Sequence, residues 1–310
     1  MCKLIVFVLL GTLSPLASAH AEPGAHHWWT LDPWVWLPMT LFGALYQRGV
    51  CLLRTKRTLS PVAPACFLLG MAALFLALIW PLDALGEISF AAHMAQHMLL
   101  MAVAAPLFSV AGTSVAMMVA LPARGRRIGT RIWRRWKWLL HPRIAFALHA
   151  TMIWFWHAPL PFEWALQSQA VHVLEHVSFL GSAMLFWSGL RRATHAGGRG
   201  EEGCGSAALW ILATLMHTGL LGALITFAPR PLYASYIEVG TVMLSPMEDQ
   251  QLAGLLMWIP GGLCYLAAGL AYAAAWLKRS ERRDRHATTG PRATTLNSRT
   301  THPGSGQWRP

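Results

Sequence analysis

The sequence predicts an all-α membrane protein, a bundle of seven transmembrane helices that follows a cleaved signal peptide. Three observations support this fold class. The 310 residues are 55% hydrophobic and only 12% charged, about half the charged fraction of a soluble domain. The hydrophobic residues fall in long blocks, each able to cross a hydrocarbon core of about 30 Å as a helix. Lys and Arg are concentrated in alternate loops between these blocks.

The first hydrophobic block has the pattern of a secretory signal peptide. Lys3 precedes a short apolar stretch, and Ala17-Ser18-Ala19 then provides a cleavage site with small residues. We therefore expect residues 1–19 to be removed after Ala19. The alternative is an uncleaved first helix.

Seven further apolar blocks form one predicted domain, residues 20–278. Each block has the length that a membrane-spanning helix requires. The predicted spans are approximately residues 34–52, 62–81, 88–110, 143–160, 168–190, 206–228 and 251–276. Residues 279–310 form a basic tail rich in Thr, Arg, Gly and Pro, which we expect to be disordered.

The basic residues predict the orientation of the bundle. Lys and Arg follow the first, third, fifth and seventh spans, whereas the other loops are mainly acidic, with Arg230 as the exception. By the positive-inside rule, we expect the mature N-terminus outside the membrane and the C-terminus inside. The net charge of +12 then indicates contact with anionic lipid rather than nucleic acid. Residues 124–140 mix Arg with Trp and predict an amphipathic interfacial helix, with RNA binding as the alternative.

Seven of the 14 histidines lie in or at the ends of the predicted spans. At 1.5 Å per residue, four of them, from four helices, lie about 12 to 16 Å below the outer surface. These four are His97, His149, His176 and His217. His93 and His172 lie one turn nearer the outside, and His157 is expected at the surface. We therefore expect His97 and His176 to belong to one polar cluster in the outer half of the bundle.

Two pairs of histidines have a spacing typical of metal ligands on a helix. His93 and His97 are four residues apart, as are His172 and His176. Both imidazoles of each pair therefore share a helix face, and two such pairs on separate helices can converge on one metal ion. Imidazole is a common ligand of Cu, Zn and Fe.

Methionine and glutamate residues extend this candidate metal site. Met94 and Met98 lie beside the first pair, and thioether sulfur favours Cu(I). Glu175 can bind the metal or accept the second N–H of a ligand histidine. Other interpretations are packing for the methionines, helix–helix hydrogen bonds for His149 or His217, and a proton relay for the whole set.

Four motifs are spread over the predicted bundle, namely HMAQHMLLMAVAAPLF, WFWHAPLPFEWAL, VHVLEHVSFLGSAMLFW and EDQQLAGLLMWIPGG. Together they resemble the membrane-integral CtaG family, the assembly factors of caa3-type cytochrome c oxidase, over about residues 35–276. The matching positions are His93, Met94, His97 and Met98; Trp156, His157 and Pro159; His172, Glu175 and His176; and Asp249, Gln250, Gly254, Met257 and Trp258. One departure is Ser188 after Trp187, where the family pattern has Trp or Pro.

The resemblance implies a seven-helix protein that is not an enzyme and that helps to mature a terminal oxidase. Its implied partners are the catalytic subunit of the oxidase or other assembly factors, and its implied cargo is copper. A predicted outer loop with Met243, Met247 and Asp249 offers soft and acidic groups to an ion that arrives from outside. His157 and Gln250 are assigned to the same access route. Packing of the two methionines onto lipid is the alternative.

Two other functions stay open on the sequence. A membrane cytochrome would use paired histidines on facing helices as axial haem ligands. A metal or proton transporter would need titratable groups through the full depth, whereas the predicted inner half holds few charged residues. A hydrolase is least favoured, because the sequence has no recognisable set of nucleophile, base and orienting group.

Reporter fusions test the predicted orientation. Alkaline phosphatase, which is active only in the periplasm, should be inactive after Lys278 and active when inserted in the acidic loop around Glu238. The physical reason is that the basic residues of alternate loops are retained on the cytoplasmic side. An active phosphatase after Lys278 would contradict the topology.

Overall fold

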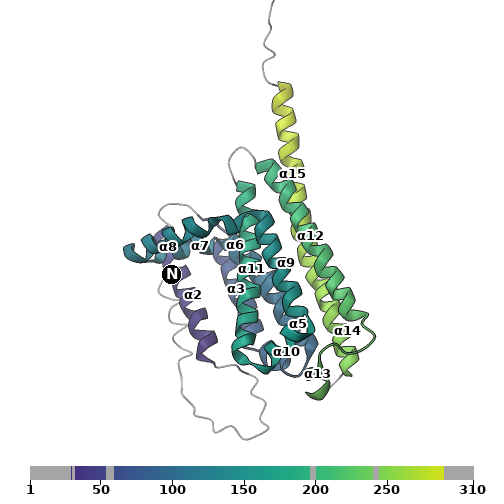
Figure 1. Cartoon of the computed structure of the whole chain (residues 1–310). Coiled ribbons are helices and arrows are strands. Elements are labelled where there is room, and N and C mark those ends of the chain that lie inside the picture. The colour runs from purple at the N-terminus through teal and green to yellow at the C-terminus, as the bar shows by residue number, and fades with distance from the viewer. Residues whose placement is uncertain (1–28, 30–31, 54–58, 196–199, 240–243, 290–310) are drawn as a thin grey trace, which may run out of the picture.

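The structure is a computed structural model that describes residue 29 and residues 32–53, 59–195, 200–239 and 244–289. The predicted signal peptide, the end of the predicted tail (residues 290–310) and Met243 lie outside these residues. Within the described ranges the chain is helical and contains no strand. Figure 1 shows the long helices packed side by side, with α8 lying across one end of the bundle.

A helix lies at each of the seven predicted spans. In chain order these are α2 (Pro33–Leu53), α3 (Ala63–Leu78), the joined segments α5 (Phe90–Met98), η2 (Leu99–Ala104) and α6 (Ala105–Ala111), then α9 (Pro142–His157), α11 (Gln169–His195), α12 (Gly200–Thr226), and the joined segments α14 (Pro246–Leu256), η4 (Met257–Gly261) and α15 (Gly262–Thr289).

Several of these helices have the length and composition of membrane spans. Among the described residues, four stretches qualify: Phe90–Ala111, Gln169–His195, Gly203–Thr226 and Pro246–Arg285. Helix α3 is apolar but shorter. The chain is therefore a multi-pass helical membrane protein, while the count of seven spans and their orientation stay predictions.

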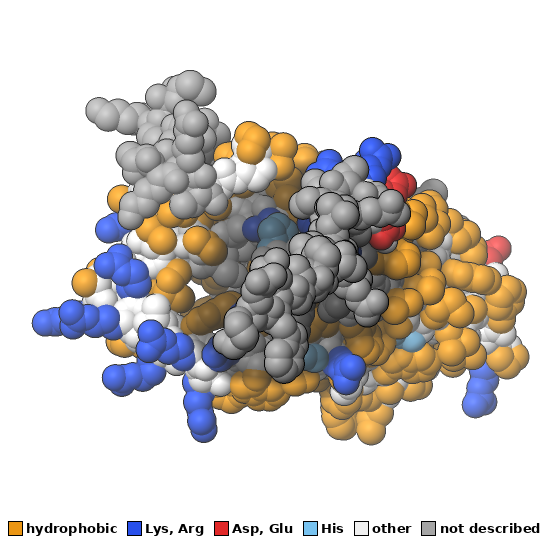
Figure 2. Space-filling model, turned by 90° about the horizontal axis from the view of Figure 1, so that it is seen from above, with side chains coloured by type: hydrophobic (Ala, Val, Ile, Leu, Met, Phe, Trp, Pro, Cys, Tyr) orange, Lys and Arg blue, Asp and Glu red, His pale blue; other side chains and the backbone are white. Residues whose placement is uncertain are grey.

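Short helices close the two ends of the bundle. One end carries α7 (Thr113–Ala120), α8 (Ala123–Trp136) and the 3-10 turn η3 (Lys137–Leu140). The other carries α4 (Leu82–Gly86), α10 (Pro159–Gln167) and α13 (Ala234–Val239). Helix α8 buries none of its residues. Figure 2 looks onto this end and shows Lys and Arg side chains gathered on the side where α8 lies in Figure 1.

The last helix corrects the predicted start of the tail. Helix α15 continues through residues 279–289, which the sequence assigned to a disordered segment. Glu281 and Arg285 lie one turn apart, a spacing that supports an exposed helix. The stretch is also rich in Arg, a good helix former, so the helix extends beyond the apolar span.

Two of the joined helices contain a π-helical segment beside a proline. Proline lacks an N–H and its ring clashes with the carbonyl group four residues earlier, so a regular α-helix cannot continue undisturbed. Pro106 follows η2, and Pro260 lies inside η4. Each π segment absorbs this disturbance within a continuous helix. Because η2 directly follows Met98, it sets the rotation of α5 relative to α6.

Two apolar clusters form the core of the described residues. One joins α2, α3, η2 and α6, where the ring of Tyr46 stacks on Phe67 with a centroid separation of 3.7 Å. The other joins α5, α9, α10, α11, α12 and α14 through large buried rings such as Phe162, Phe179 and Phe186. The second cluster surrounds the histidines of α5 and α11.

The start of α5 is held by a carboxylate from α14. Asp249 accepts hydrogen bonds from the backbone N–H of Phe90 at 2.6 Å and of Ala91 at 3.2 Å, and from the Ser89 hydroxyl at 2.7 Å. Ser89 itself accepts from the N–H of Ala92 at 3.2 Å. A carboxylate at a helix N-terminus satisfies free N–H groups and complements the helix dipole. This contact fixes α5, and hence its two histidines, against α14.

Helices α12 and α14 approach closely through two glycines. A Cβ atom added at Gly254 would lie 2.6 Å from the carbonyl oxygen of Gly222, and one added at Gly222 would lie 2.8 Å from that of Gly254. Small residues allow such backbone contact between helices in membranes. The placement of Asp249 on α14 therefore depends on the absence of side chains at these two positions.

We predict that Gly254→Ala destabilises the protein by about 1–3 kcal/mol, because the new methyl group meets backbone atoms that cannot rotate away. Gly181→Ala is the matched control, since a Cβ there has nothing within 4 Å. The control should be neutral or slightly stabilising, because Ala is the better helix former. Thermal unfolding of both variants in lipid nanodiscs measures the difference, and equal stability would contradict the close packing.

Candidate metal centre

Three helices bring five histidines and a glutamate together near one end of the bundle. Helices α5 and α11 begin at this end, and α9 finishes there. Each four-residue spacing places two imidazoles on the same face of its helix, as predicted. The residues are His93 and His97 from α5, His157 from α9, and His172, Glu175 and His176 from α11. We refer to these six residues as the histidine cluster.

Four members of the histidine cluster have the spacing of a metal site. His93, His172, Glu175 and His176 each offer one ligand atom, and these atoms all lie within 4.8 Å of one another. Glu175 is fully buried, and the other three side chains are buried or half-buried. Such a separation brings all four atoms within reach of one ion at bond lengths of roughly 2 Å after small side-chain movements.

The carboxylate of Glu175 lies between the imidazoles of His93 and His97. One carboxylate oxygen of Glu175 is 3.7 Å from Nε2 of His93, and the other is 3.7 Å from Nε2 of His97. The ring centroids of His97 and His176 are 5.3 Å apart, and those of His97 and His157 are 5.9 Å apart. The prediction that His97 and His176 belong to one cluster therefore agrees with the structure.

A hydrogen bond that His93 donates to Tyr236 determines which nitrogen of His93 carries the lone pair that faces Glu175. The Tyr236 hydroxyl donates to the carbonyl oxygen of Gly86 at 2.7 Å and lies 3.1 Å from Nδ1 of His93. Because its single hydrogen is used, the hydroxyl oxygen accepts a hydrogen bond from Nδ1–H of His93. The neutral imidazole then directs the lone pair of Nε2 toward Glu175, which is the form that binds a metal.

In His157, a hydrogen bond within its own helix determines which ring nitrogen carries the hydrogen. Its Nδ1 donates to the carbonyl oxygen of Ile153 at 2.7 Å, so Nε2 carries the lone pair in the neutral ring. The backbone carbonyl of His157 accepts a hydrogen bond from the hydroxyl of Tyr233 at 2.9 Å. Two imidazoles of the histidine cluster thus have their ligating nitrogen set by contacts on the opposite side of the ring.

The inward-facing polar atoms of the histidine cluster have no hydrogen-bond partner among the described residues. They are Nε2 of His93, His97, His157, His172 and His176, Nδ1 of His97 and both carboxylate oxygens of Glu175. A buried polar group without a partner costs about 1–3 kcal/mol, and more when charged. Imidazole lone pairs and carboxylate oxygens also repel one another, so the arrangement fits a cation or shared protons at the centre.

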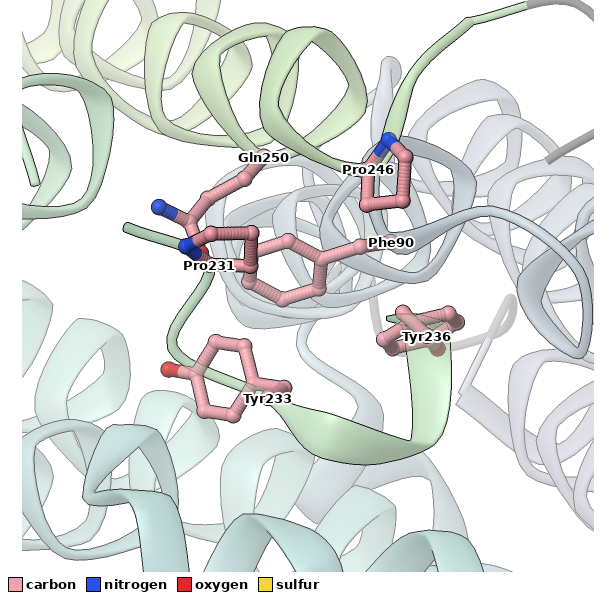
Figure 3. A pocket seen from close by; sticks show the side chains of 6 residues that line it. All are labelled: Phe90, Pro231, Tyr233, Tyr236, Pro246 and Gln250. Atoms are coloured by element: carbon pink, nitrogen blue, oxygen red, sulfur yellow. The ribbon is translucent and has the colours of Figure 1, made fainter. Parts of the chain in front are cut away.

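Aromatic rings separate the histidine cluster from the end of the bundle. At this end Phe162 of α10 packs on His93 with a centroid separation of 5.2 Å. Phe179 packs on His97 at 4.6 Å from the interior side, since it lies about one turn further along α11 than His176. Tyr233, just before α13, and Tyr236, within α13, line a cavity of about 10 Å³, which has room for about one water molecule. Figure 3 shows this cavity with Phe90, the two tyrosines, Gln250 and two prolines around it.

Sequence reasoning missed these tyrosines because they lie outside the predicted spans. Helix α13 is anchored to α10, since the backbone N–H and hydroxyl of Ser235 both donate to the carboxylate of Glu163. In the sequence these residues appear only as two tyrosines, three positions apart, in a predicted loop. That pattern alone does not indicate contact with His93. The contact arises only when α10 and α13 fold over the ends of α5 and α9.

The predicted surface position of His157 is wrong. The residue is buried, and its ring lies beside His97. The reason is that the chain turns after His157 and α10 covers the end of α9. His157 therefore belongs to the histidine cluster itself rather than to an outer access route.

His149 and His217 are separate from the histidine cluster. His149 lies eight residues, about 12 Å of helix, from His157 along α9. Its Nδ1 is 3.1 Å from the Ser182 hydroxyl and its Nε2 is 3.4 Å from the Tyr265 hydroxyl. His217 packs edge-on against Phe146 at 5.6 Å. The predicted common level of His97 and His149 is wrong, because it is His157 that lies beside His97, and His149 is eight residues away along α9. The contacts of His149 agree with helix–helix hydrogen bonding, the alternative interpretation.

The predicted methionine ligands lie in packed surroundings. Met94 is fully buried in the apolar core, and Met98 packs against Gly261, where an added Cβ would lie 2.7 Å from its sulfur. Both contacts agree with the packing alternative. Met247 is half-buried in the first turn of α14, and Met243 lies outside the described residues.

Asp249 and Gln250 have structural contacts instead of the predicted access role. Both side chains are buried. Asp249 caps α5, as described above. The side chain of Gln250 accepts from the N–H of Leu232 at 2.7 Å and donates to the carbonyl oxygens of Ile225 at 3.3 Å and Arg230 at 3.4 Å. The polar groups of both residues are therefore used in holding α5 and the segment before α13.

Comparison with known proteins agrees with the resemblance of the four motifs. The family model of the cytochrome c oxidase caa3 assembly factor matches residues 44–279, a range that includes the whole histidine cluster. No curated protein and no solved structure gave a match. Because the match covers most of the chain, the protein belongs to the family of caa3-type cytochrome c oxidase assembly factors.

Proposed function

We propose that this protein binds a copper ion at the histidine cluster and delivers it to a haem–copper oxidase during assembly in the bacterial plasma membrane. The family supplies the assembly role. The observation that supports metal handling is the set of buried, unpartnered imidazole nitrogens around Glu175. On this proposal copper is cargo, and the protein is not an enzyme.

The donor set suits copper. Imidazole nitrogen and carboxylate oxygen bind several divalent metals, and Cu(II) binds most tightly among the first-row divalent ions. Imidazole also accepts Cu(I), whose single charge would cancel that of an ionised Glu175. A neutral pair is the least costly arrangement in a low-dielectric interior. The buried position of Glu175, whose ion-pair contacts within the described ranges are with histidines and not with Lys or Arg, thus favours Cu(I) as the cargo.

The side chains around the metal position have distinct roles in this proposal. His93, His172, His176 and Glu175 hold the ion, while Tyr236 keeps Nε2 of His93 directed toward it. His97 lies against the other oxygen of Glu175 and offers a further imidazole. A neighbouring ligand of this kind allows an ion to leave by exchange of one ligand at a time.

The packing favours a bare ion over haem. Bis-imidazole ligation requires a flat slot between two helices that is wide enough for the macrocycle. Here the rings of His93 and His172 are 5.2 Å apart, those of His172 and His176 are 4.2 Å apart, and Glu175 lies among them. Haem binding would therefore require α5 and α11 to separate.

We predict that the purified protein binds copper through the histidine cluster. His176→Ala should lower copper affinity by at least tenfold, whereas His149→Ala, which removes a buried histidine outside the cluster, should leave it unchanged. Tyr236→Phe keeps all ligands but loses the hydrogen bond to His93, and such supporting contacts contribute about 10–100-fold to metal affinity.

Competition titration with a copper chelator, followed by metal analysis and a visible spectrum, provides the measurement. Equal copper affinity in the wild type and His176→Ala would contradict the proposed site. An absorption spectrum of a haem with copper absent would instead support the cytochrome alternative.

We also predict that His97→Ala combined with His176→Ala abolishes most haem–copper oxidase activity in the host, while the oxidase subunits are still made. Most packing in the bundle is apolar and distant from these rings, so the variant should reach the membrane at normal levels, as an immunoblot can show. Restoration of activity by added copper would support metal delivery. Full oxidase activity with normal copper content would refute it, and His149→Ala again serves as the control.

A further inference from the structure

A second cavity lies at the opposite end of α11 from the histidine cluster. Fifteen residues of this helix, about 22 Å, separate Arg191 from His176. The cavity has a volume of about 320 Å³ and lies between the α6–α7 turn, η3 and the last turns of α11. It belongs to the basic end of the bundle, which Figure 2 shows from above.

Positive charge lines one side of this cavity. Arg191 and Arg192 both face it, and neither forms an ion pair within the described part of the chain. Arg191 donates to the carbonyl oxygen of Val110 at 3.3 Å, which leaves most of its five N–H groups free for another acceptor. The guanidinium group of Arg192 lies 5.9 Å from the ring centre of Trp133. Two neighbouring guanidinium groups without a carboxylate favour an anion.

A buried hydroxyl points to a ligand at the same place. Ser109 lines the cavity, is only 7% exposed, and its Oγ has no hydrogen-bond partner among the described residues. The chain turns at Gly112, whose φ of 67° is left-handed, and α7 then begins with Thr113 and Ser114 at the cavity wall. A helix N-terminus and a free hydroxyl beside two arginines make a setting suited to phosphate oxygens.

Another part of the cavity lining is apolar. It is formed by the side chains of Phe108, Val115, Trp133 and Leu140. A free phosphate ion would make no favourable contact with these apolar side chains, whereas the glycerol and upper acyl region of a lipid would cover them. The neighbouring helix α8 is exposed and carries Arg and Trp, which are typical of a helix at a lipid interface.

We propose that this cavity binds the phosphate group of one anionic phospholipid, with Arg191, Arg192 and Ser109 as its polar contacts. Clusters of basic residues between membrane helices are suited to such headgroups. The site is independent of copper binding, because it involves other residues at the other end of α11.

The test is native mass spectrometry of the full-length protein in detergent with dioleoylphosphatidylglycerol, dioleoylphosphatidylcholine or inorganic phosphate. One phosphatidylglycerol should stay bound to the wild type, and phosphatidylcholine should not. Arg192→Gln should weaken this binding by about tenfold, because hydrogen bonds to charged groups contribute on the order of 1.5–3 kcal/mol. Ser109→Ala should weaken it less. Arg230→Gln, at the other end of α12, is the matched control and should bind normally.

Arg192→Lys is the control that distinguishes loss of the phosphate contact from a general loss of structure. It keeps the charge but not the planar guanidinium group, so binding should be partly retained. Equal retention of phosphatidylglycerol by the wild type and Arg192→Gln would overturn the proposal. Displacement of the lipid by inorganic phosphate at the same concentration would overturn the assignment to a lipid.

Discussion

The buried carboxylate of Glu175 is the constraint on which the rest of this structure depends. A charge inside a membrane protein is tolerated only with a partner, and the groups around Glu175 are imidazoles whose Nε2 atoms have no other use. Without a cation or protons, these lone pairs would repel the carboxylate oxygens 3.7 Å away. The cluster therefore gains stability from whatever positive charge occupies its centre, and its occupancy is coupled to the packing of α5 against α11.

Much of the remaining polar chemistry of the bundle serves to hold this arrangement. Asp249 reaches from α14 to the N-terminus of α5, and α14 can approach because glycines face each other at the α12 contact. Helices α10 and α13 then cover the histidines, with Glu163 and Ser235 joining the two. The contacts that stabilise the fold thus also position the imidazoles, since each of them fixes a helix that carries an imidazole or a residue in contact with one.

The sequence was informative where the physics is local. Long apolar blocks predicted the helices, and the four-residue spacing predicted that each histidine pair shares a face. That the histidines of α5 and α11 lie close together was predicted from the similar depths of His97 and His176 in their spans. The depths of His157 and His149 could not be obtained this way, because they depend on α10 folding back over α9. The contact between Tyr236 and His93 joins residues 143 positions apart and leaves no periodic signal. Asp249 was assigned to the access route because an acidic residue in a loop shows no sign of the helix that it caps.

The two ends of α11 differ in a way that bears on mechanism. One end presents imidazoles and a carboxylate, which attract a cation, while the other presents Arg191 and Arg192, which repel one. Between them, His149 is hydrogen-bonded to Ser182 and stacked near Phe186, so its ring is already committed to contacts between helices. A metal ion that moved through the bundle would have to break these contacts and then pass the arginines. If the histidine cluster binds copper as proposed, the distribution of charge therefore favours receipt and release of the ion on a single face over its transport across the membrane.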